Sequence, residues 1–324
     1  MYKKILIYNS GGGLGDTIQL FPIILSLKNH FKNCTFYYIG AHTNHFSYKL
    51  KDYNIRMETI DLDIKYFGFR WWHLFNVKRK IVEKKISKFD LTIDLQSKVR
   101  NTLILKQIPA HNFFSSTFNF FFCSNKNSYL KKESNINLLI LKNLEIFLQK
   151  KIKKINFKPE MLDAKYLHEA KVLLPSKNYI GFSVTQGNEY RLKTWPIEKF
   201  IALAKKYILI GKKAVFFIEK SDQELISHIK NEIPSAIFPE SASEISSPPL
   251  VSALATRLEK TVTIDNGIMH MVSLAGTPMV TLFGPTNSEK FSPQRDNVTI
   301  LDSKVLYNTN DISKISVEDV FNFS

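Results

Sequence analysis

The chain begins with a glycine-rich loop that carries one carboxylate. Residues 10–17 read Ser-Gly-Gly-Gly-Leu-Gly-Asp-Thr and follow a short apolar run, residues 3–8, that we predict as a strand. In an α/β domain such a loop enters a helix, whose first N–H groups and positive partial charge attract anions. Gly12, Gly13 and Gly15 would let a ligand approach the backbone, and Asp16 adds a carboxylate there. An aspartate that only caps the helix is the alternative.

Two nucleotide-binding fingerprints do not fit this loop. A dinucleotide fingerprint needs G-x-G-x-x-G, and counting from Gly11 the third glycine position is occupied by Asp16. The second predicted strand, residues 35–39, is followed by Gly40-Ala41, which offers no acidic residue for a ribose. No Gly-Lys-Ser or Gly-Lys-Thr follows, as a phosphate-binding P-loop would require. The sequence therefore argues against both NAD binding and a P-loop.

A lysine in the second half stands where a phosphate could be bound. Lys193 lies in the segment 186–196, between a predicted strand and a helix that begins at Trp195-Pro196. Proline suits the first turn of a helix, where its missing N–H costs nothing. The lysine would neutralise a phosphate at a cleft between domains, or it would be one charge of a solvated loop.

Two more strand ends of the second half carry polar residues. Residues 263–270 read Thr-Ile-Asp-Asn-Gly-Ile-Met-His, so a strand ends at Asp265 and a helix begins after Asn266 and Gly267. Such a helix start suits a diphosphate, and His270 lies one turn further along the same face. Residues 282–287, Leu-Phe-Gly-Pro-Thr-Asn, form a similar strand end that contains Thr286.

Strands that alternate with helices would hold these residues in place. The predicted strands are residues 3–8, 35–39, 56–60, 91–95, 179–183, 214–218, 261–264 and 279–283, and the predicted helices are residues 17–31, 70–86, 99–105, 136–149, 196–208, 222–231, 268–274 and 316–323. This alternation is typical of a parallel sheet with crossover helices. A length of 324 residues favours two domains. We place them at residues 1–160 and 161–324, with the terminal helix packing back on the first.

The excess of positive over negative charge lies entirely in the first half. Residues 1–160 contain 27 Lys and Arg against 11 Asp and Glu, whereas residues 161–324 contain 18 of each, so the net charge of +16 belongs to the first half. Such an excess serves solubility, or it marks a domain that meets an anionic partner such as a phosphorylated lipid or a membrane surface. We expect no nucleic-acid partner, because no recognised nucleic-acid-binding motif is present.

Metal and disulfide chemistry are not indicated. Two cysteines, Cys34 and Cys123, form neither a disulfide framework nor a zinc site, and they favour a reducing cytosol. Asp61-Leu62-Asp63 would suit a metal-dependent transferase, but the triplet lies in the wrong half for a nucleotide–metal site. The apolar runs, such as residues 112–123, are shorter than the roughly 20 residues that a membrane span needs.

Four short motifs together resemble glycosyltransferase family 9, the ADP-heptose:lipopolysaccharide heptosyltransferases. They are G-G-L-G-D at residues 12–16, K-x-W-P at 193–196, D-x-G-x-x-H at 265–270 and F-G-P-T at 283–286. They occur in the family's order and at compatible spacing across nearly the whole chain. The resemblance implies a GT-B architecture, in which two Rossmann-like, doubly wound α/β domains face each other across a cleft.

The resemblance also implies an inverting, metal-independent transfer that needs no cofactor. A heptose or related sugar would pass from an ADP-sugar to a lipopolysaccharide inner-core acceptor, which is a phosphorylated, lipid-linked oligosaccharide. The enzyme would be cytoplasmic and peripheral at the inner membrane. Asp16 would be the general base on the acceptor side. The expected donor-binding residues are Lys193, Glu224, Asp265, Asn266, Gly267, His270 and Thr286.

Departures from the family pattern leave alternatives open. Asn266 replaces the usual Ser or Thr, and residues 219–221 lack the glycines common in the family, which leaves the nucleoside open. A nucleotide-sugar 2-epimerase of the same architecture is one alternative, and it would turn over a nucleotide sugar alone. A non-catalytic, basic nucleotide-binding module is the other, and it would have no need of Asp16.

Overall fold

The protein divides into two compact units. The computed structural model describes residues 2–11, 13–40, 44–133, 136–186, 193–293 and 295–323. Unit 1 comprises Met1–Lys51 and Ile55–Asn156, and unit 2 comprises Asp52–Asn54 and Phe157–Ser324. The passage from one unit to the other thus lies a few residues before the expected boundary at 160, and Asp52–Asn54 belong to unit 2.

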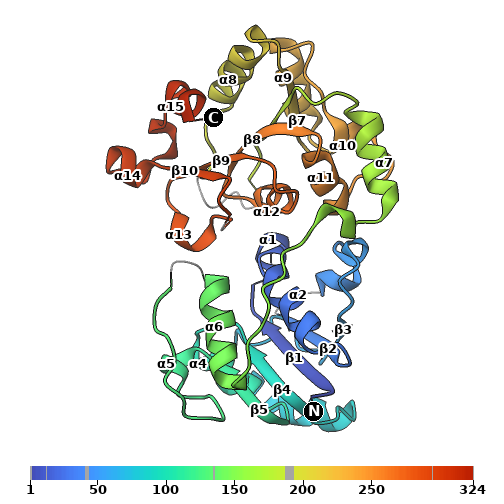
Figure 1. The fold of residues 1–324 in the computed structure, drawn as a ribbon, viewed down its shortest axis with the longest axis vertical. Helices are drawn as coiled ribbons and strands as arrows, with labels where there is room; N and C mark the ends of the chain where they lie inside the picture. The colour runs from blue at the N-terminus through green and yellow to red at the C-terminus, as the bar shows by residue number, and fades with distance from the viewer. Residues whose placement is uncertain are drawn as a thin grey trace. The chain divides into compact units, whose positions relative to one another are not determined.

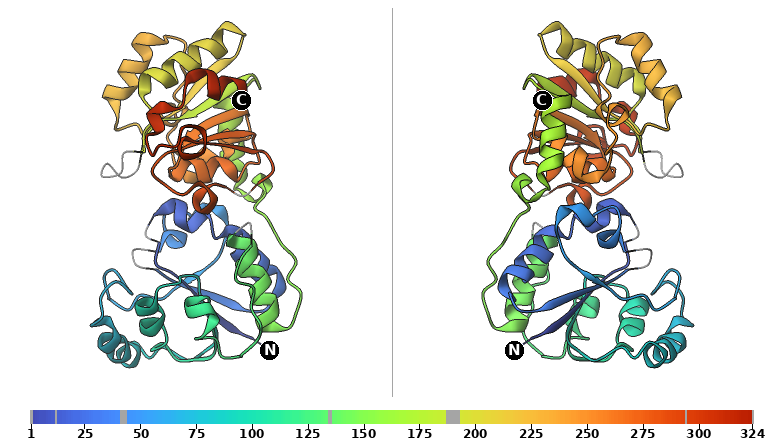
Figure 2. Two further views of the ribbon diagram at one scale, coloured as in Figure 1. Left: turned by 90° about the vertical axis from the view of Figure 1, so that its left-hand side faces the viewer. Right: turned by 90° about the vertical axis from the view of Figure 1, so that its right-hand side faces the viewer.

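Unit 1 is a parallel sheet covered by helices on both faces. Its strands are β1 (Lys4–Asn9), β2 (Thr35–Gly40), β3 (Glu58–Thr59), β4 (Phe89–Asp94) and β5 (Ala110–Ser115), in the order β3-β2-β1-β4-β5. Its helices are α1 (Leu14–Ile18), α2 (Phe21–His30), α3 (His73–Glu83), α4 (Val99–Leu105), α5 (Thr117–Phe120) and α6 (Ile136–Leu148). Helices α2 and α6 cover one face, and α3 and α4 cover the other (Figures 1 and 2).

Unit 2 repeats this plan with a different strand order. Its strands are β6 (Tyr179–Ser183), β7 (Lys213–Phe217), β8 (Leu258–Ile264), β9 (Met279–Phe283) and β10 (Val298–Asp302), all parallel, in the order β10-β9-β8-β6-β7. Its helices are α7 (Ala164–Leu173), α8 (Ile197–Leu209), α9 (Gln223–Glu232), α10 (Pro239–Ala242), α11 (Pro248–Ala255), α12 (Gly267–Ser273), α13 (Ser288–Phe291), α14 (Ser303–Tyr307) and α15 (Val317–Phe323). The predicted pair of parallel-sheet α/β domains is therefore confirmed.

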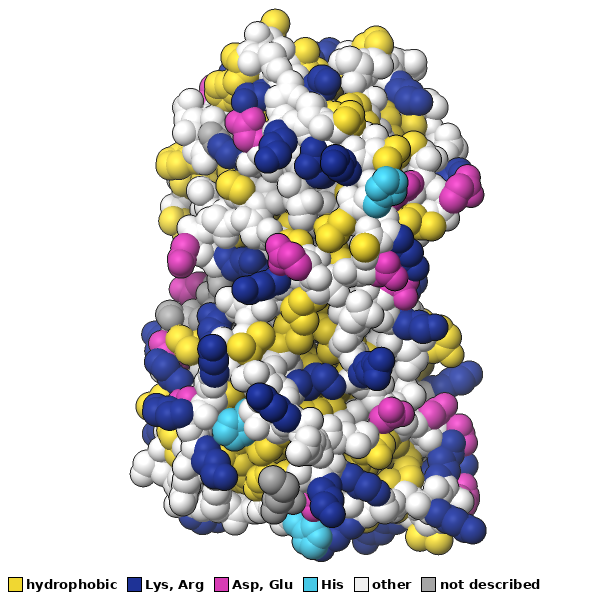
Figure 3. Space-filling model, turned by 45° about the vertical axis from the view of Figure 1, so that its right-hand side comes forward, with side chains coloured by type: hydrophobic (Ala, Val, Ile, Leu, Met, Phe, Trp, Pro, Cys, Tyr) yellow, Lys and Arg dark blue, Asp and Glu magenta, His cyan; other side chains and the backbone are white. Residues whose placement is uncertain are grey.

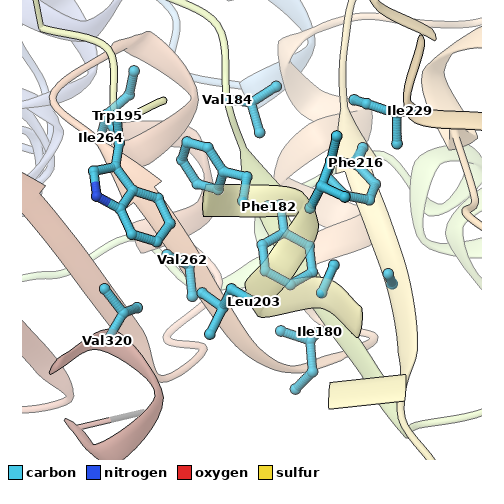
Figure 4. Close-up of a cluster of buried hydrophobic side chains, with 14 of the residues drawn as sticks. Ile180, Phe182, Val184, Trp195, Leu203, Phe216, Ile229, Val262, Ile264 and Val320 are labelled. Atoms are coloured by element: carbon cyan, nitrogen blue, oxygen red, sulfur yellow. The ribbon is translucent and has the colours of Figure 1, made fainter. Parts of the chain in front are cut away.

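Aromatic packing fixes the helices of unit 2 on its sheet. The rings of Phe182 on β6 and Phe216 on β7 stack with centroids 5.0 Å apart. Trp195, which precedes α8, meets Phe200 edge-on, and its Nε1–H donates to the carbonyl of Ile315 at 2.9 Å. Figure 4 shows Phe182, Phe216 and Trp195 within one buried cluster, to which Phe200 also belongs. The Trp-Pro of the K-x-W-P motif is therefore an anchor that fixes the loop carrying Lys193.

The terminal helix is part of unit 2, where α15 packs on α8. That it also packs back on the first domain stays a prediction. Val320 enters the core of unit 2, and Phe321 contacts Tyr207 with ring centroids 5.3 Å apart. Among the described residues, no helix is long and apolar enough to cross a membrane.

Candidate active site

The glycine loop of unit 1 lies where the order of the strands in its sheet reverses. β1 is paired with β2 on one side and with β4 on the other, so the loop after β1 opens at the switch point where α/β sheets bind ligands. Asp16 stands exposed in the first turn of α1. Its Oδ2 accepts a hydrogen bond from the backbone N–H of Gly13 at 3.2 Å, and Gly13 itself is the N-cap residue.

Two glycines of this loop leave room for the side chain of Asp16. A Cβ added at Gly11 would lie 2.6 Å from Asp16 Cβ, so the chain would have to shift there. A Cβ added at Gly13 would lie 3.0 Å from Asp16 Oδ2, so the carboxylate would have to move by a few tenths of an ångström. Gly15 lies inside α1, and Gly12 lies outside the described residues.

A hollow of about 730 Å³ opens at the carboxyl ends of β2 and β3. Tyr38 and Gly40 line it from β2, and Asp61 and Tyr66 line it from the segment after β3. Gly40 is paired in the sheet with Asn9, the last residue of β1, so the hollow lies beside the glycine loop. Burial raises the pKa of Tyr38 to about 12, and the charge of Asp16 adds to the rise. Aromatic rings and carboxylates together suit a polyhydroxylated ligand.

The Asp61-Leu62-Asp63 triplet is tied into ion pairs. Lys84 Nζ lies 2.9 Å from Asp63 Oδ2 and Lys80 Nζ lies 3.9 Å from it, and these lysines hold the pKa of Asp63 below its usual range. Within the described parts of the chain, no group of three or more His, Cys, Asp and Glu residues is placed to hold a metal ion.

Unit 2 brings two of the predicted donor-binding residues, Lys193 and Asp265, into contact. Lys193 Nζ lies 2.5 Å from Asp265 Oδ2, and the two side chains are 15% and 9% exposed. Lys193 precedes α8, and Asp265 follows β8, which is paired with β6 at the switch point of this sheet. The backbone N–H of Lys193 also donates to Gln186 Oε1 at 3.1 Å. Lys193 is thus a largely buried, oriented ammonium group and not a solvated loop charge.

Asn266 joins the strand ends around this pair. Its Nδ2 donates to Ser183 Oγ and to the carbonyl of Thr185, both at 2.7 Å, and its Oδ1 accepts from the N–H of Met269 at 2.9 Å as the N-cap of α12. Among the described residues, a Cβ added at Gly267 would meet only Met271 Cε, at 3.9 Å. The packing of the described residues therefore does not require glycine at 267.

His270 is buried in α12, one turn after Asn266, and is uncharged near neutral pH. Burial lowers its pKa to about 4; the charge of Asp265 opposes that shift and the charge of Lys193 adds to it. A neutral imidazole offers one hydrogen-bond donor and one acceptor, so it suits a sugar hydroxyl or a phosphate oxygen without adding charge.

In the F-G-P-T segment, Gly284 is fixed by packing, and Thr286 carries a side-chain hydroxyl that could bind a ligand. A Cβ at Gly284 would lie 2.8 Å from the carbonyl oxygen of Asn310, so packing dictates this glycine. The carbonyl of Thr286 accepts from Lys304 Nζ at 3.0 Å, whereas Thr286 Oγ1 is buried without a hydrogen-bond partner among the described residues.

The family of the chain follows from a match over most of its length. The model of glycosyltransferase family 9 (heptosyltransferase) matches residues 76–320. The chain belongs to glycosyltransferase family 9. It is therefore a glycosyltransferase, as the four motifs predicted.

Two curated family 9 relatives share sequence with this glycosyltransferase. Lipooligosaccharide heptosyltransferase 2 of Campylobacter jejuni is 22% identical over 294 residues, which are 89% of this chain and 83% of that protein. The protein of the same name from Haemophilus influenzae is 27% identical over 132 residues. That alignment spans 40% of this chain and well under half, 38%, of the relative.

Solved structures share the fold of this family 9 enzyme. The Escherichia coli heptosyltransferase WaaC with ADP has a TM-score of 0.69 at 15% identity, covering 99% of this chain and 96% of that one. A UDP-GlcNAc 2-epimerase from Neisseria meningitidis is less similar, with a TM-score of 0.53 at 14% identity, covering 99% and 90%. These likenesses show a GT-B fold.

One predicted ligand stands apart, and one buried carboxylate had no motif to signal it. Glu224 is exposed in the first turn of α9 and makes no hydrogen bond or ion pair with the Lys193 cluster among the described residues. Glu240, at the start of α10, is 7% exposed, and its Oε2 has no hydrogen-bond partner in the described structure. Burial raises the pKa of Glu240 to about 7, and nearby Glu219 adds to the rise. Only the apolar residues Phe238-Pro239 before it hinted at burial.

Proposed function

We propose that this family 9 enzyme transfers a heptose or related sugar from an ADP-sugar to a lipopolysaccharide inner-core acceptor, with inversion at the anomeric carbon. The observation that carries the proposal is the largely buried Lys193–Asp265 pair at the switch point of unit 2, beside the backbone of Gly267. A buried ammonium group next to a glycine backbone suits a diphosphate. The ADP in the E. coli neighbour and the names of the curated relatives support the choice of donor and acceptor.

The donor side of the proposed reaction depends on charge. As the bond from the anomeric carbon to the diphosphate breaks, negative charge grows on the leaving nucleoside diphosphate. Lys193 would stabilise this charge in a site that partly excludes water, where such interactions are strong. Asn266 and His270 would position the donor, and Thr286 would add a hydroxyl. Glu224 would contact the ribose after a change of side-chain position.

The acceptor side depends on Asp16. The attacking hydroxyl is a poor nucleophile near neutral pH, so a base must take its proton as the new C–O bond forms. Asp16 is exposed and held by one backbone N–H, so it keeps acceptor capacity for that proton. The neighbouring hollow, with Tyr38 and Asp61 in its lining, would hold the acceptor sugar. Attack opposite to the leaving diphosphate inverts the anomeric configuration.

The acceptor would be a phosphorylated, lipid-linked oligosaccharide at the cytoplasmic face of the inner membrane. The net charge of residues 1–160, +16, would draw unit 1 to such an anionic surface. In this proposal Lys193 and His270 would stabilise the leaving diphosphate, and the transfer would need neither a metal nor a cofactor.

Product analysis tests the proposal. The enzyme is incubated with ADP-heptose and a heptose-deficient lipopolysaccharide core, with chelator present, and the acceptor is weighed by mass spectrometry. One added heptose with release of ADP is the expected result. Turnover of a nucleotide sugar without any acceptor would support the 2-epimerase alternative, and neither reaction with any nucleotide sugar would support the non-catalytic module. Thermal shifts with ADP-, UDP- and GDP-sugars identify the nucleoside, because a ligand at 100 times its Kd adds roughly 2.7 kcal/mol.

A further inference from the structure

One layer of unit 1 exposes large apolar side chains in unusual density. These side chains belong to the segment before α3, to α3, and to α5 with the residue that follows it, and each is more than half exposed. We call them the α3–α5 face: Tyr66 (55%), Trp71 (56%), Trp72 (59%), Phe75 (77%), Val82 (78%), Phe118 (67%) and Phe121 (65%). α3 packs against α4 and α4 packs against α5, so the segments are neighbours on one side of the sheet (Figure 2).

The fold itself does not need this face. α3 already buries His73, Val77 and Ile81, of which Val77 and Ile81 enter the core of unit 1. Phe118 has a φ of 51°, in the left-handed region that costs a residue other than glycine about 1–2 kcal/mol. The chain thus accepts strain where Phe118 is exposed, and such strain is typical of functional surfaces.

Cations surround the exposed rings. Residues 64–126 contain twelve Lys and Arg and three Asp and Glu, a net charge of +9. The guanidinium of Arg70 lies 5.7 Å from the ring centre of Trp72, and Lys126 Nζ lies 4.8 Å from that of Phe121. Figure 3 shows Lys and Arg side chains spread widely over the surface that it draws. Aromatic rings edged by lysines and arginines differ from the centre of a protein–protein interface, where lysine is depleted.

We propose that the α3–α5 face docks on an anionic lipid surface. The indole and phenyl rings lie among the lipid headgroups, where Trp and Phe partition well, and the surrounding Lys and Arg contact lipid phosphates. Each such cation near an anionic surface strengthens binding by about fivefold. The face gives the lipid-linked acceptor of the proposed function its place of encounter, and only in that respect does it rest on that function.

Tryptophan fluorescence reads this contact directly. The chain has three tryptophans, of which Trp71 and Trp72 are on the face and Trp195 is 1% exposed in unit 2. Vesicles of phosphatidylcholine with phosphatidylglycerol should shift the emission to shorter wavelength, and brominated acyl chains should quench it. Vesicles of phosphatidylcholine alone should do neither. Emission that ignores both lipid charge and bromination would overturn the proposal.

Variants separate the face from the total charge. The triple variant Trp71→Ser/Trp72→Ser/Phe75→Ser should lower co-sedimentation with anionic vesicles by about tenfold or more, because it removes apolar area that the face would bury in the lipid. Arg70→Gln/Lys78→Gln should lower it by about thirtyfold at low salt. If the triple aromatic variant binds like the wild type, general basicity explains the binding and the proposal is wrong.

Controls distinguish this failure from failure of the proposed function. Leu209→Ser/Val305→Ser removes two side chains of unit 2 that are 85% and 82% exposed, and it should bind vesicles like the wild type. Transfer to a delipidated, water-soluble core oligosaccharide should remain intact in the face variants. Loss of vesicle binding by the control pair as well would show that any exposed apolar group suffices, and that would contradict a dedicated face.

Discussion

At the scale of single residues, the Lys193–Asp265 pair explains why a lysine can be kept largely buried before any donor arrives. Nζ and Oδ2 are 2.5 Å apart, so the carboxylate compensates the ammonium charge while its position stays fixed. Because the ammonium group is already held in place, it would lose little conformational freedom when the proposed diphosphate donor binds. The same pairing means that removing the lysine affects stability as well as catalysis.

Lys193→Ala should therefore lower both kcat/KM and the melting temperature. A charged hydrogen bond contributes about 1.5–3 kcal/mol, so kcat/KM should fall roughly ten- to a hundredfold. The unpaired Asp265 should cost about 3–5 kcal/mol of stability. Adding Asp265→Asn removes that buried charge and should restore the melting temperature without restoring activity. Lys205→Ala, which removes an exposed lysine of α8, is the matched control. Unchanged steady-state kinetics in a folded Lys193→Ala protein would exclude the lysine from donor binding.

Two glycines of unit 2 predict opposite outcomes for one substitution. Among the described residues, Gly267→Ala has room for its methyl group, so the free energy of unfolding should stay within about 0.5 kcal/mol of the wild type. A methyl group forced into a close ligand contact costs about 1–3 kcal/mol, so donor affinity should fall about ten- to a hundredfold. Gly284→Ala meets the carbonyl of Asn310 and should lose stability by a similar amount. Calorimetric titration with ADP and thermal unfolding measure both, and normal ADP binding by Gly267→Ala would contradict the assignment.

At the scale of elements, the sequence predicts the inner strands and misses parts of the periphery. The run at 279–283 and the helix at 99–105 coincide with β9 and α4 because their boundaries are set by local breaks. We expected one helix at 17–31, but the chain breaks before Phe21-Pro22, since proline favours a new helix start. β5 and β10 were not predicted. Only the last two or three residues of each strand are buried, so the apolar pattern that marks a strand is short in both.

The candidate site was predicted as far as its motifs extend. Asp16, Lys193 and Asp265 follow strands at the switch points, which alternation of elements makes predictable. The pairing of Lys193 with Asp265 joins residues 72 positions apart, and only the packing of β6 against β8 reveals it. Glu240 lies in α10 beyond β7, where no spacing rule signals a buried carboxylate.

The buried Glu240 on the short helix α10 should make the stability of the protein depend on pH. Glu240 titrates at about 7 when folded and near 4.5 when unfolded, so the folded state holds the proton more tightly. Below pH 4.5 Glu240 is protonated in both states, and its burial does not lower the free energy of unfolding. As the pH rises from 4.5 to about 7, the free energy of unfolding falls by about 3 kcal/mol in total. Glu240→Gln should remove this loss and raise the melting temperature at pH 8. Exposed Glu244→Gln is the control, and equal pH profiles for Glu240→Gln and the wild type would refute the prediction.

At the scale of the whole molecule, charge and chemistry are divided between the two units. Unit 1 carries the excess of Lys and Arg, the α3–α5 face and the carboxylate at the glycine loop, whereas unit 2 carries the lysine, asparagine and histidine suited to a diphosphate. We therefore propose that unit 1 contacts lipid and activates the acceptor and that unit 2 binds the donor. A single substitution in unit 1 should abolish transfer and leave donor binding intact.

Asp16→Asn tests that division most directly. Asparagine keeps the shape of the side chain and an oxygen that accepts from the N–H of Gly13, so the loop and the helix should keep their stability. It cannot take a proton, and loss of a general base costs about 10²–10⁴ in kcat. Melting temperature, ADP affinity and the rate of heptose transfer are measured on one preparation. The account predicts wild-type stability and ADP affinity with transfer lost by that factor, and wild-type transfer by Asp16→Asn would contradict it.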